Sequence, residues 1–125
     1  MLDTNICSYI IKGYIEKSRV LNKRIVLSSI VVSELLYGAK KKNSKKLIQI
    51  VDIFINTFEI YNFDKNAGKE YAKIRVDLEK QGLIIGAYDL QIAAHAKSLG
   101  AILVTNNIKE FSRVKGLRLE NWLSE

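Results

Sequence analysis

Short runs of β-branched and other apolar residues alternate along this chain with longer segments whose apolar residues recur at helical spacing. The short runs are typical of buried strands, and the longer segments are typical of helices that cover a sheet. The runs span residues 24–28, 58–63, 101–105 and 117–120. Strands separated by helices favour parallel pairing, so we predict an α/β fold in which helices flank a mostly parallel sheet.

The chain shows no internal boundary and no mark of export. Its 125 residues contain no proline, no repeat and no Gly/Ser-rich linker, so we expect one domain over residues 1–125. The only cysteine, Cys7, cannot form an intramolecular disulfide and fits a reducing compartment. No apolar run approaches the ~18 residues of a membrane span, and no signal peptide follows Met1. We expect a cytoplasmic protein with no membrane contact.

Helix starts are marked by capping residues. Thr4 is predicted to cap a first helix, Ser28 or the serine after it a second, and Asp64 a third that runs toward residue 82. Gly100 is predicted to close a helix that spans residues 88–99.

Positive charge is concentrated in the first half of the chain. The net charge is +7, from 20 basic and 13 acidic residues. The densest basic cluster consists of Lys40, Lys41, Lys42, Lys45 and Lys46. Such a cluster can bind a polyanion through counterion release, or it can be the solvated end of a helix, and the cluster alone leaves both interpretations open.

Glu34 is an acidic residue in an unexpected place. It is the one carboxylate between Glu16 and Asp52, a stretch with nine lysines and arginines, and it lies inside the apolar run 30–37. Its helical neighbours three and four residues away are largely apolar, so an unpaired charge there costs several kcal/mol. A basic side chain or a bound cation must therefore face it.

Four polar positions are predicted to meet at one end of the sheet. Asp3 follows the first strand and Asn107 follows the strand 101–105. Glu34 lies one turn into the helix after the strand 24–28, and Asp89 opens the helix that leads to the strand 101–105. Ligands of open α/β sheets bind beyond the carboxyl ends of the strands, which is where these side chains gather.

Taken singly, most of these residues also have a structural explanation. Asp89 can be a favourable charge in the first turn of a helix, and Asp3 a turn residue at a strand end. Asn107 with Glu110 three residues later has the spacing of a capping box, which favours a structural role for Glu110. Glu34 has no such explanation.

Taken together, the acids require a cation. Two carboxylates ~4 Å apart repel each other by up to ~4 kcal/mol at an effective dielectric constant of ~20. Oxygen-only ligands favour magnesium, with manganese as a substitute. The only histidine, His95, lies roughly opposite Asp89 on its helix, so we exclude a zinc site and expect His95 to be a packing or surface residue.

Five ordered blocks of the sequence resemble the PIN-domain ribonucleases of the VapC toxin family. They are LDTN at 2–5, SELLYG at 33–38, DLQIAAHA at 89–96, LVTNNIKEF at 103–111 and VKGLRLENW at 114–122. The resemblance covers essentially the whole chain. It implies a three-layer α/β/α PIN-like domain with a central, mostly parallel sheet of four to five short strands.

The resemblance also implies a function. The chain would be a magnesium-dependent endoribonuclease, the toxin of a type II toxin–antitoxin pair, in which a metal-activated water cuts RNA and leaves 5′-phosphate ends. A VapB-like antitoxin would inhibit it and link it indirectly to operator DNA, and the toxin would form a homodimer. The basic cluster 40–46 would steer the RNA backbone.

Site residues follow from the matching positions. Asp3, Glu34 and Asp89 match the three acidic metal ligands, and Asn107 stands at the fourth place, where many relatives have aspartate. The implied supporting residues are Asn5, Thr105 and Glu110. Asparagine removes one negative charge, so Glu110 or a substrate phosphate would supply the missing oxygen.

The start of the chain departs from the family pattern. Relatives have several strand residues before the Asp-Thr-Asn block, whereas here only Met1 and Leu2 precede Asp3. We therefore expect a very short first strand, unless residues that precede Met1 complete it.

Two rival functions come from other classes. A phosphoacceptor receiver domain also places acids at the ends of parallel strands, but this chain lacks an acidic pair after the first strand and a lysine in the right context near the last. The stronger rival is a catalytically silent PIN-like binding protein that acts through antitoxin and operator DNA.

Overall fold

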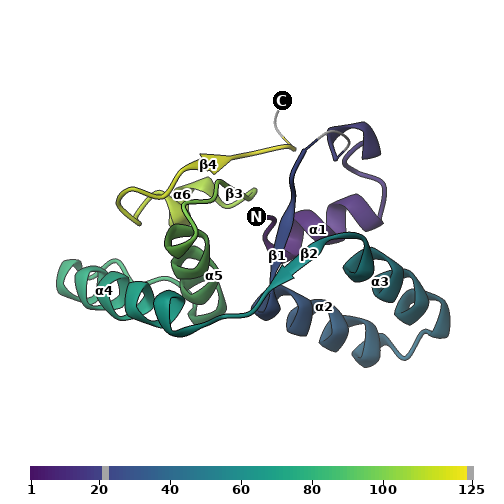
Figure 1. Cartoon of the computed structure of the whole chain (residues 1–125), viewed down its shortest axis with the longest axis horizontal. Helices are drawn as coiled ribbons and strands as arrows, with labels where there is room; N and C mark the ends of the chain where they lie inside the picture. Colours follow the sequence, from purple (N-terminus) through teal and green to yellow (C-terminus); the bar gives the residue numbers. More distant parts are fainter. Residues whose placement is uncertain (21–22, 124–125) are drawn as a thin grey trace.

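The computed structural model describes residues 1–20 and 23–123, with helices on both sides of short parallel strands (Figure 1). The helices are α1 (Thr4–Ile11), α2 (Ser29–Lys42), α3 (Lys45–Thr57), α4 (Lys65–Gln81), α5 (Ala87–Ser98) and α6 (Ile108–Phe111), with a 3₁₀ turn η1 (Lys17–Arg19). The strands are β1 (Val26–Ser28), β2 (Glu59–Tyr61), β3 (Leu103–Val104) and β4 (Leu119–Glu120). Helices α1, α2 and α3 pack together, and α4 packs on α5. The predicted α/β fold is confirmed.

The first residues of the chain join two pairs of parallel strands. Strand β1 pairs with β2, and β3 pairs with β4. Leu2 lies between the pairs, because it forms a parallel bridge with Val104 and its N–H lies 3.4 Å from the carbonyl oxygen of Val26. The predicted single sheet is thus realised as two pairs linked through one residue, and the short first strand is reduced to this bridge. Each strand is also shorter than the apolar run that predicted it.

The helix caps explain where the acidic residues lie. Asp3, and not the predicted Thr4, caps α1, because the Asp3 Oδ1 atom accepts a hydrogen bond from the Ile6 N–H at 2.9 Å. The predicted caps of α2 by Ser28 and of α4 by Asp64 are confirmed. The Thr4 prediction was wrong by one residue because an aspartate caps as well as a threonine, and only the backbone conformation separates the two positions.

Helix α5 is the centre of the core. Six of its residues are buried, and a helix that is buried nearly all round must have packing partners on every side. It packs against α4 and also contacts α2. Gly100, just beyond α5, adopts the left-handed conformation with φ of 64°, and the chain then turns directly into β3. None of the described helices is both long and apolar enough to cross a membrane.

A buried hydrogen bond ties α5 to the start of α2. The Oγ atom of Ser28 accepts the Ile30 N–H at 3.1 Å and lies 2.7 Å from His95 Nδ1. The His95 ring also packs edge-on against Phe63, with the ring centroids 5.6 Å apart. Burial lowers the pKa of His95, because a charged imidazole is poorly solvated there. His95 is therefore a packing residue, as predicted, and it is not on the surface.

We expect Ser28→Ala to destabilise the protein by ~2–4 kcal/mol, because it removes a helix cap and leaves a buried imidazole nitrogen without its partner. Ser44→Ala is the matched control. Ser44 caps α3 through the Leu47 N–H and has no second buried partner among residues 1–20 and 23–123, so its loss should cost only about 1 kcal/mol. Urea unfolding of both variants measures the difference, and equal losses would contradict the role given to His95.

Candidate acidic metal site

Asp3 is held at the centre of the strands. Its backbone N–H donates to the Val104 carbonyl at 3.0 Å, and its side chain is only 4% exposed. Burial raises the pKa of the Asp3 carboxyl, and the nearby Glu34 charge raises it further. Hydrogen bonds from the Thr105 side chain and from the Ile6 N–H act in the opposite direction, because they favour the ionised form.

Glu34 lies in the second turn of α2 and is half-buried. Its Oε1 atom accepts a hydrogen bond from the Thr4 hydroxyl at 2.8 Å. Of the two partners expected for Glu34, a basic side chain or a cation, the basic side chain is not found, since no ion pair among the described residues includes Glu34. Sequence reasoning missed Thr4 as a site residue, although its place directly after Asp3 was a usable signal.

The pKa of Asp89 indicates that several acidic side chains lie close together. Asp89 lies in the first turn of α5, and the pKa of its carboxyl is raised to about 6. Burial is the largest cause, followed by the charges of Asp3, Glu110 and Glu34. The four carboxylates come from separate elements: Asp89 from α5, Asp3 from the residue that caps α1, Glu110 from α6 and Glu34 from α2. Asp3, Glu34 and Glu110 therefore lie close enough to Asp89 for their charges to act on it.

Asn107 and Glu110 interact through their side chains. The Asn107 Nδ2 atom donates to Glu110 Oε2 at 2.9 Å, and the Asn107 N–H donates to Thr105 Oγ1 at 2.9 Å. Asn107 makes no side-chain cap on α6, so the capping box predicted from the spacing is wrong. The amide instead holds the Glu110 carboxylate beside the acidic group.

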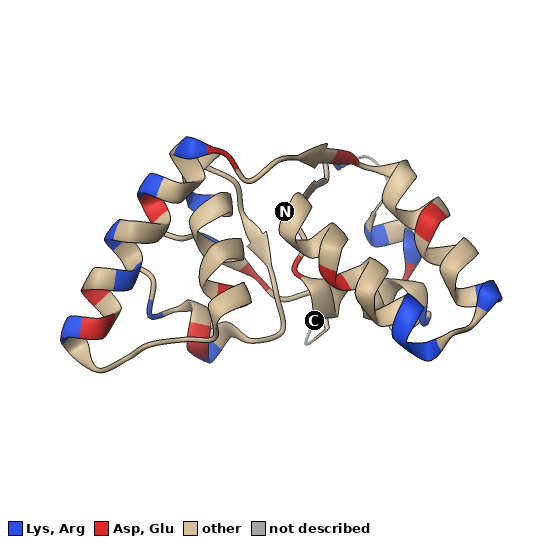
Figure 2. Cartoon of the chain, turned by 90° about the horizontal axis from the view of Figure 1, so that it is seen from below, with Lys and Arg blue, Asp and Glu red and all other residues tan. Residues whose placement is uncertain are grey.

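The remaining predicted residues lie farther out. Asn5 is exposed, and in the described part of the chain its side chain makes no hydrogen bond to an acidic group. The five clustered lysines are exposed at the end of α2 and the start of α3. Figure 2 shows basic segments at this α2–α3 end of the molecule, whereas basic and acidic segments alternate along α4 at the opposite end. Lys42 lines a groove of about 240 Å³ together with Lys12, Thr4 and Glu34.

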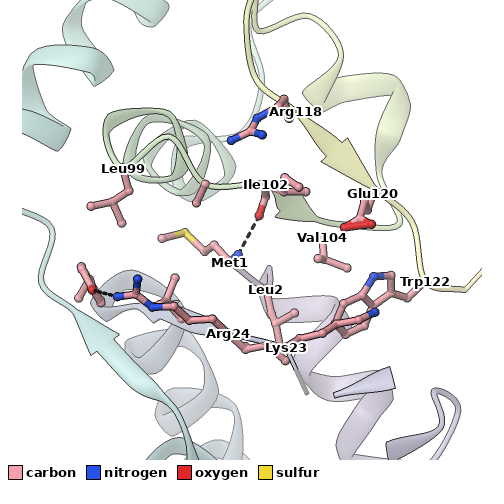
Figure 3. Close-up of a pocket in the computed structure, with 14 residues that line it drawn as sticks. Met1, Leu2, Lys23, Arg24, Leu99, Ile102, Val104, Arg118, Glu120 and Trp122 are labelled. Carbon is pink, nitrogen blue, oxygen red and sulfur yellow. Dashed lines mark hydrogen bonds between the residues drawn. The ribbon is translucent and has the colours of Figure 1, made fainter. Parts of the chain in front are cut away.

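A larger cavity lies at the other end of the strands. It has a volume of about 480 Å³ and a lining that includes Lys23, Arg24, Arg118 and Trp122 (Figure 3). The Met1 amino group donates to the Ile102 carbonyl at 2.7 Å on its wall (Figure 3). None of the four clustered acids lines this cavity, so its size does not make it the candidate site.

The donor set of the acidic site fits a hard divalent cation. Its oxygens come from carboxylates, an amide and hydroxyls. Among the described residues, no lysine or arginine forms an ion pair with these acids. No three of the described acidic side chains are arranged to enclose an ion directly. Magnesium keeps several waters and needs only one or two direct carboxylates, so this wider spacing is compatible with it.

Comparison of this chain with known proteins shows the family to which it belongs. Residues 1–117 match the PIN domain. The chain is 47% identical to ribonuclease VapC2 of Rickettsia felis, in an alignment that covers 98% of this chain and 96% of that protein. The chain belongs to the VapC family of PIN domains. It is also 39% identical to the tRNA(fMet)-specific endonuclease VapC of Salmonella typhimurium, over 98% of this chain and 96% of that protein.

A solved structure of a VapC relative has the same fold. It is the VapBC2 complex of Rickettsia felis bound to a DNA fragment from its promoter, and the matched chain is 46% identical with a TM-score of 0.89. The match covers 98% of this chain and 97% of that chain. The PIN-domain fold predicted from the five sequence blocks is thereby confirmed.

The raised pKa of Asp89 predicts a pH-dependent stability. Its carboxyl has a pKa of about 6 in the folded protein against an ordinary value of 3.8, so the folded state binds more protons than the unfolded state between these values. Stability contributed by the protonated form is present below about pH 4 and is lost as the pH rises through about 6. In chelator, Asp89→Asn should therefore exceed the wild type in stability at pH 7.5, on the order of 1 kcal/mol after solvent screening.

Urea unfolding across pH 3 to 8 tests this prediction. The advantage of Asp89→Asn should shrink as the pH falls and should be absent at about pH 3.5, where both side chains are neutral. A difference that stays constant with pH would show that neither burial nor charge repulsion raises the pKa of Asp89 in the folded protein.

Proposed function

We propose that this VapC-family chain is a magnesium-dependent endoribonuclease and the toxin of a type II toxin–antitoxin pair. The observation that carries the proposal is the convergence of four carboxylates from separate elements, with the pKa of Asp89 raised to about 6 by burial and by its acidic neighbours. Such an arrangement destabilises the folded protein unless it binds a cation. The names of the relatives, ribonuclease VapC2 and tRNA(fMet)-specific endonuclease, favour RNA as the substrate.

Each residue of the site has a proposed role. Asp3, Glu34 and Asp89 would hold the metal, and Asn107 would offer a neutral oxygen while its amide nitrogen holds Glu110 as a fourth carboxylate. Thr105 orients Asp3 and supports the backbone of Asn107 through one hydroxyl. The Asn5 side chain is exposed in the first turn of α1, from where it would contact substrate.

The chemistry needs no nucleophilic side chain. When bound, magnesium would lower the pKa of the attacking water and offset the negative charge that develops on the phosphate. Asp3 and Glu34 are both fixed by hydrogen bonds from α1, which limits the movement of their oxygens. Lys12 and Lys42 line the groove that begins at Glu34, and they would attract the RNA backbone together with the other exposed lysines of the cluster.

The proposed partners follow from the solved relatives. A VapBC complex from Rickettsia felis and one from Salmonella typhimurium are described as bound to DNA. We propose that this chain likewise binds a VapB-like antitoxin and reaches operator DNA through it. We also propose a homodimer, which rests on the family resemblance alone. A chain that binds RNA but never cuts it under any metal condition would instead be the silent binding protein.

Removing one carboxylate charge should abolish cleavage without unfolding the protein. We expect Asp3→Asn, Glu34→Gln and Asp89→Asn each to lower the rate of RNA cleavage by at least about 100-fold. Each substitution weakens the binding of the cation, which supplies several kcal/mol of transition-state stabilisation. Glu79→Gln is the control, since Glu79 is an exposed residue of α4 that pairs with Arg75. Initiator tRNA and bulk RNA are suitable substrates. Undiminished cleavage by all three variants would refute the site.

Chelation should stop the reaction reversibly. EDTA is expected to remove activity, and added magnesium or manganese is expected to restore it, because both ions accept oxygen ligands in octahedral geometry. The measurement is gel analysis of end-labelled fragments, which should carry 5′-phosphate ends. Cleavage that continues in EDTA, and that persists in the Glu34→Gln protein, would point to a contaminating nuclease.

A further inference from the structure

The first turn of α1 engages both carboxylates that flank it. The N–H of Ile6 donates to Asp3 Oδ1 at 2.9 Å, and the hydroxyl of Thr4 donates to Glu34 Oε1 at 2.8 Å. The first contact is an ordinary helix cap, which needs no further explanation. The second joins residues 30 positions apart and does not cap a helix.

The Thr4 bond leaves Glu34 with two unequal oxygens. Oε1 accepts one hydrogen bond from the hydroxyl, whereas Oε2 has no hydrogen-bond partner in the described part of the chain. The charge of Glu34 raises the pKa of both Asp3 and Asp89, which places this carboxylate among the acids. The Oε2 atom of Glu34 is therefore the oxygen more available to bind a cation at the site.

Magnesium and calcium differ in how many oxygens of one carboxylate they usually bind. Magnesium requires near-ideal octahedral geometry at 2.0–2.1 Å and accepts single oxygens and waters. Calcium takes six to eight oxygens at 2.3–2.6 Å and commonly binds a carboxylate through both of its oxygens. The Thr4 hydroxyl uses one lone pair of Oε1 and holds the carboxylate in one orientation, which hinders binding through both oxygens and thus disfavours calcium more than magnesium.

We infer that Thr4 is a positioning residue that restricts Glu34 to one-oxygen coordination and so makes the acidic site select magnesium over calcium. This inference rests on the proposed metal-dependent function. It assigns metal selectivity to a residue that touches no metal itself, through a hydrogen bond that the tertiary structure creates between α1 and α2.

Ser8 provides a matched control on the same helix. It lies one turn after Thr4 and lines the same groove as Thr4 and Glu34. No hydrogen bond joins the Ser8 hydroxyl to Glu34 in the part of the chain that the structure describes. Ser8→Ala therefore removes a neighbouring hydroxyl without changing the Glu34 carboxylate.

The test measures the affinities of magnesium and calcium separately, by titration calorimetry on the apo protein without RNA. Thr4→Val keeps the shape of the side chain and removes the donor, and it should raise the affinity for calcium relative to magnesium by about tenfold. Thr4→Ala should do the same if the valine protein does not fold. Thr4→Ser restores the hydroxyl and should keep the wild-type ratio, as should Ser8→Ala.

The outcomes separate this inference from the proposed function. An unchanged calcium-to-magnesium ratio in folded Thr4→Val or Thr4→Ala, with cleavage by the wild type intact, overturns the inference alone. If the Thr4 variants shift the calcium-to-magnesium ratio but the wild type never cuts RNA, the inference is supported and the proposed nuclease function is overturned. A wild type that binds neither ion overturns both.

Discussion

The backbone bridge at Leu2 is the constraint on which the rest of the structure depends. The described strands form two separate parallel pairs, and the first residues of the chain are what lie between them. The Val104 N–H donates to the Met1 carbonyl at 2.8 Å, and the Asp3 N–H donates to the Val104 carbonyl at 3.0 Å. Because Asp3 directly follows this bridge, the contact that joins the two halves also fixes the central carboxylate.

Helical termini then bring the other acids to Asp3. Asp3 caps α1, Asp89 lies in the first turn of α5, and Glu110 lies in the short helix after β3. Helix N-termini favour negative charge, which offsets part of the repulsion among these groups. The raised pKa of Asp89 shows that the offset is incomplete. The site therefore stores unfavourable charge energy in the folded protein, and a cation can release it.

The core keeps this charged cluster rigid. Helix α5 carries Asp89 at its exposed start and is buried along most of its remaining length. His95, near the far end of the same helix, is hydrogen-bonded to the residue that caps α2, the helix of Glu34. Apolar packing and one buried polar bond thus hold two of the four acids at a fixed separation, although the acids repel each other.

The sequence by itself determined the alternation of strands and helices and the caps at Ser28 and Asp64, because periodicity and capping signals are local properties of the chain. The positions of Asp3, Glu34 and Asp89 at the ends of predicted elements were only a prediction that these side chains meet. Only the tertiary structure decided what depends on contacts between distant segments. It replaced the capping box by the Asn107–Glu110 bond, buried His95 against Ser28, and gave Glu34 a hydroxyl partner from α1. Such side-chain partners are fixed by how α1, α2 and α6 pack, and spacing along the chain carries no record of that packing.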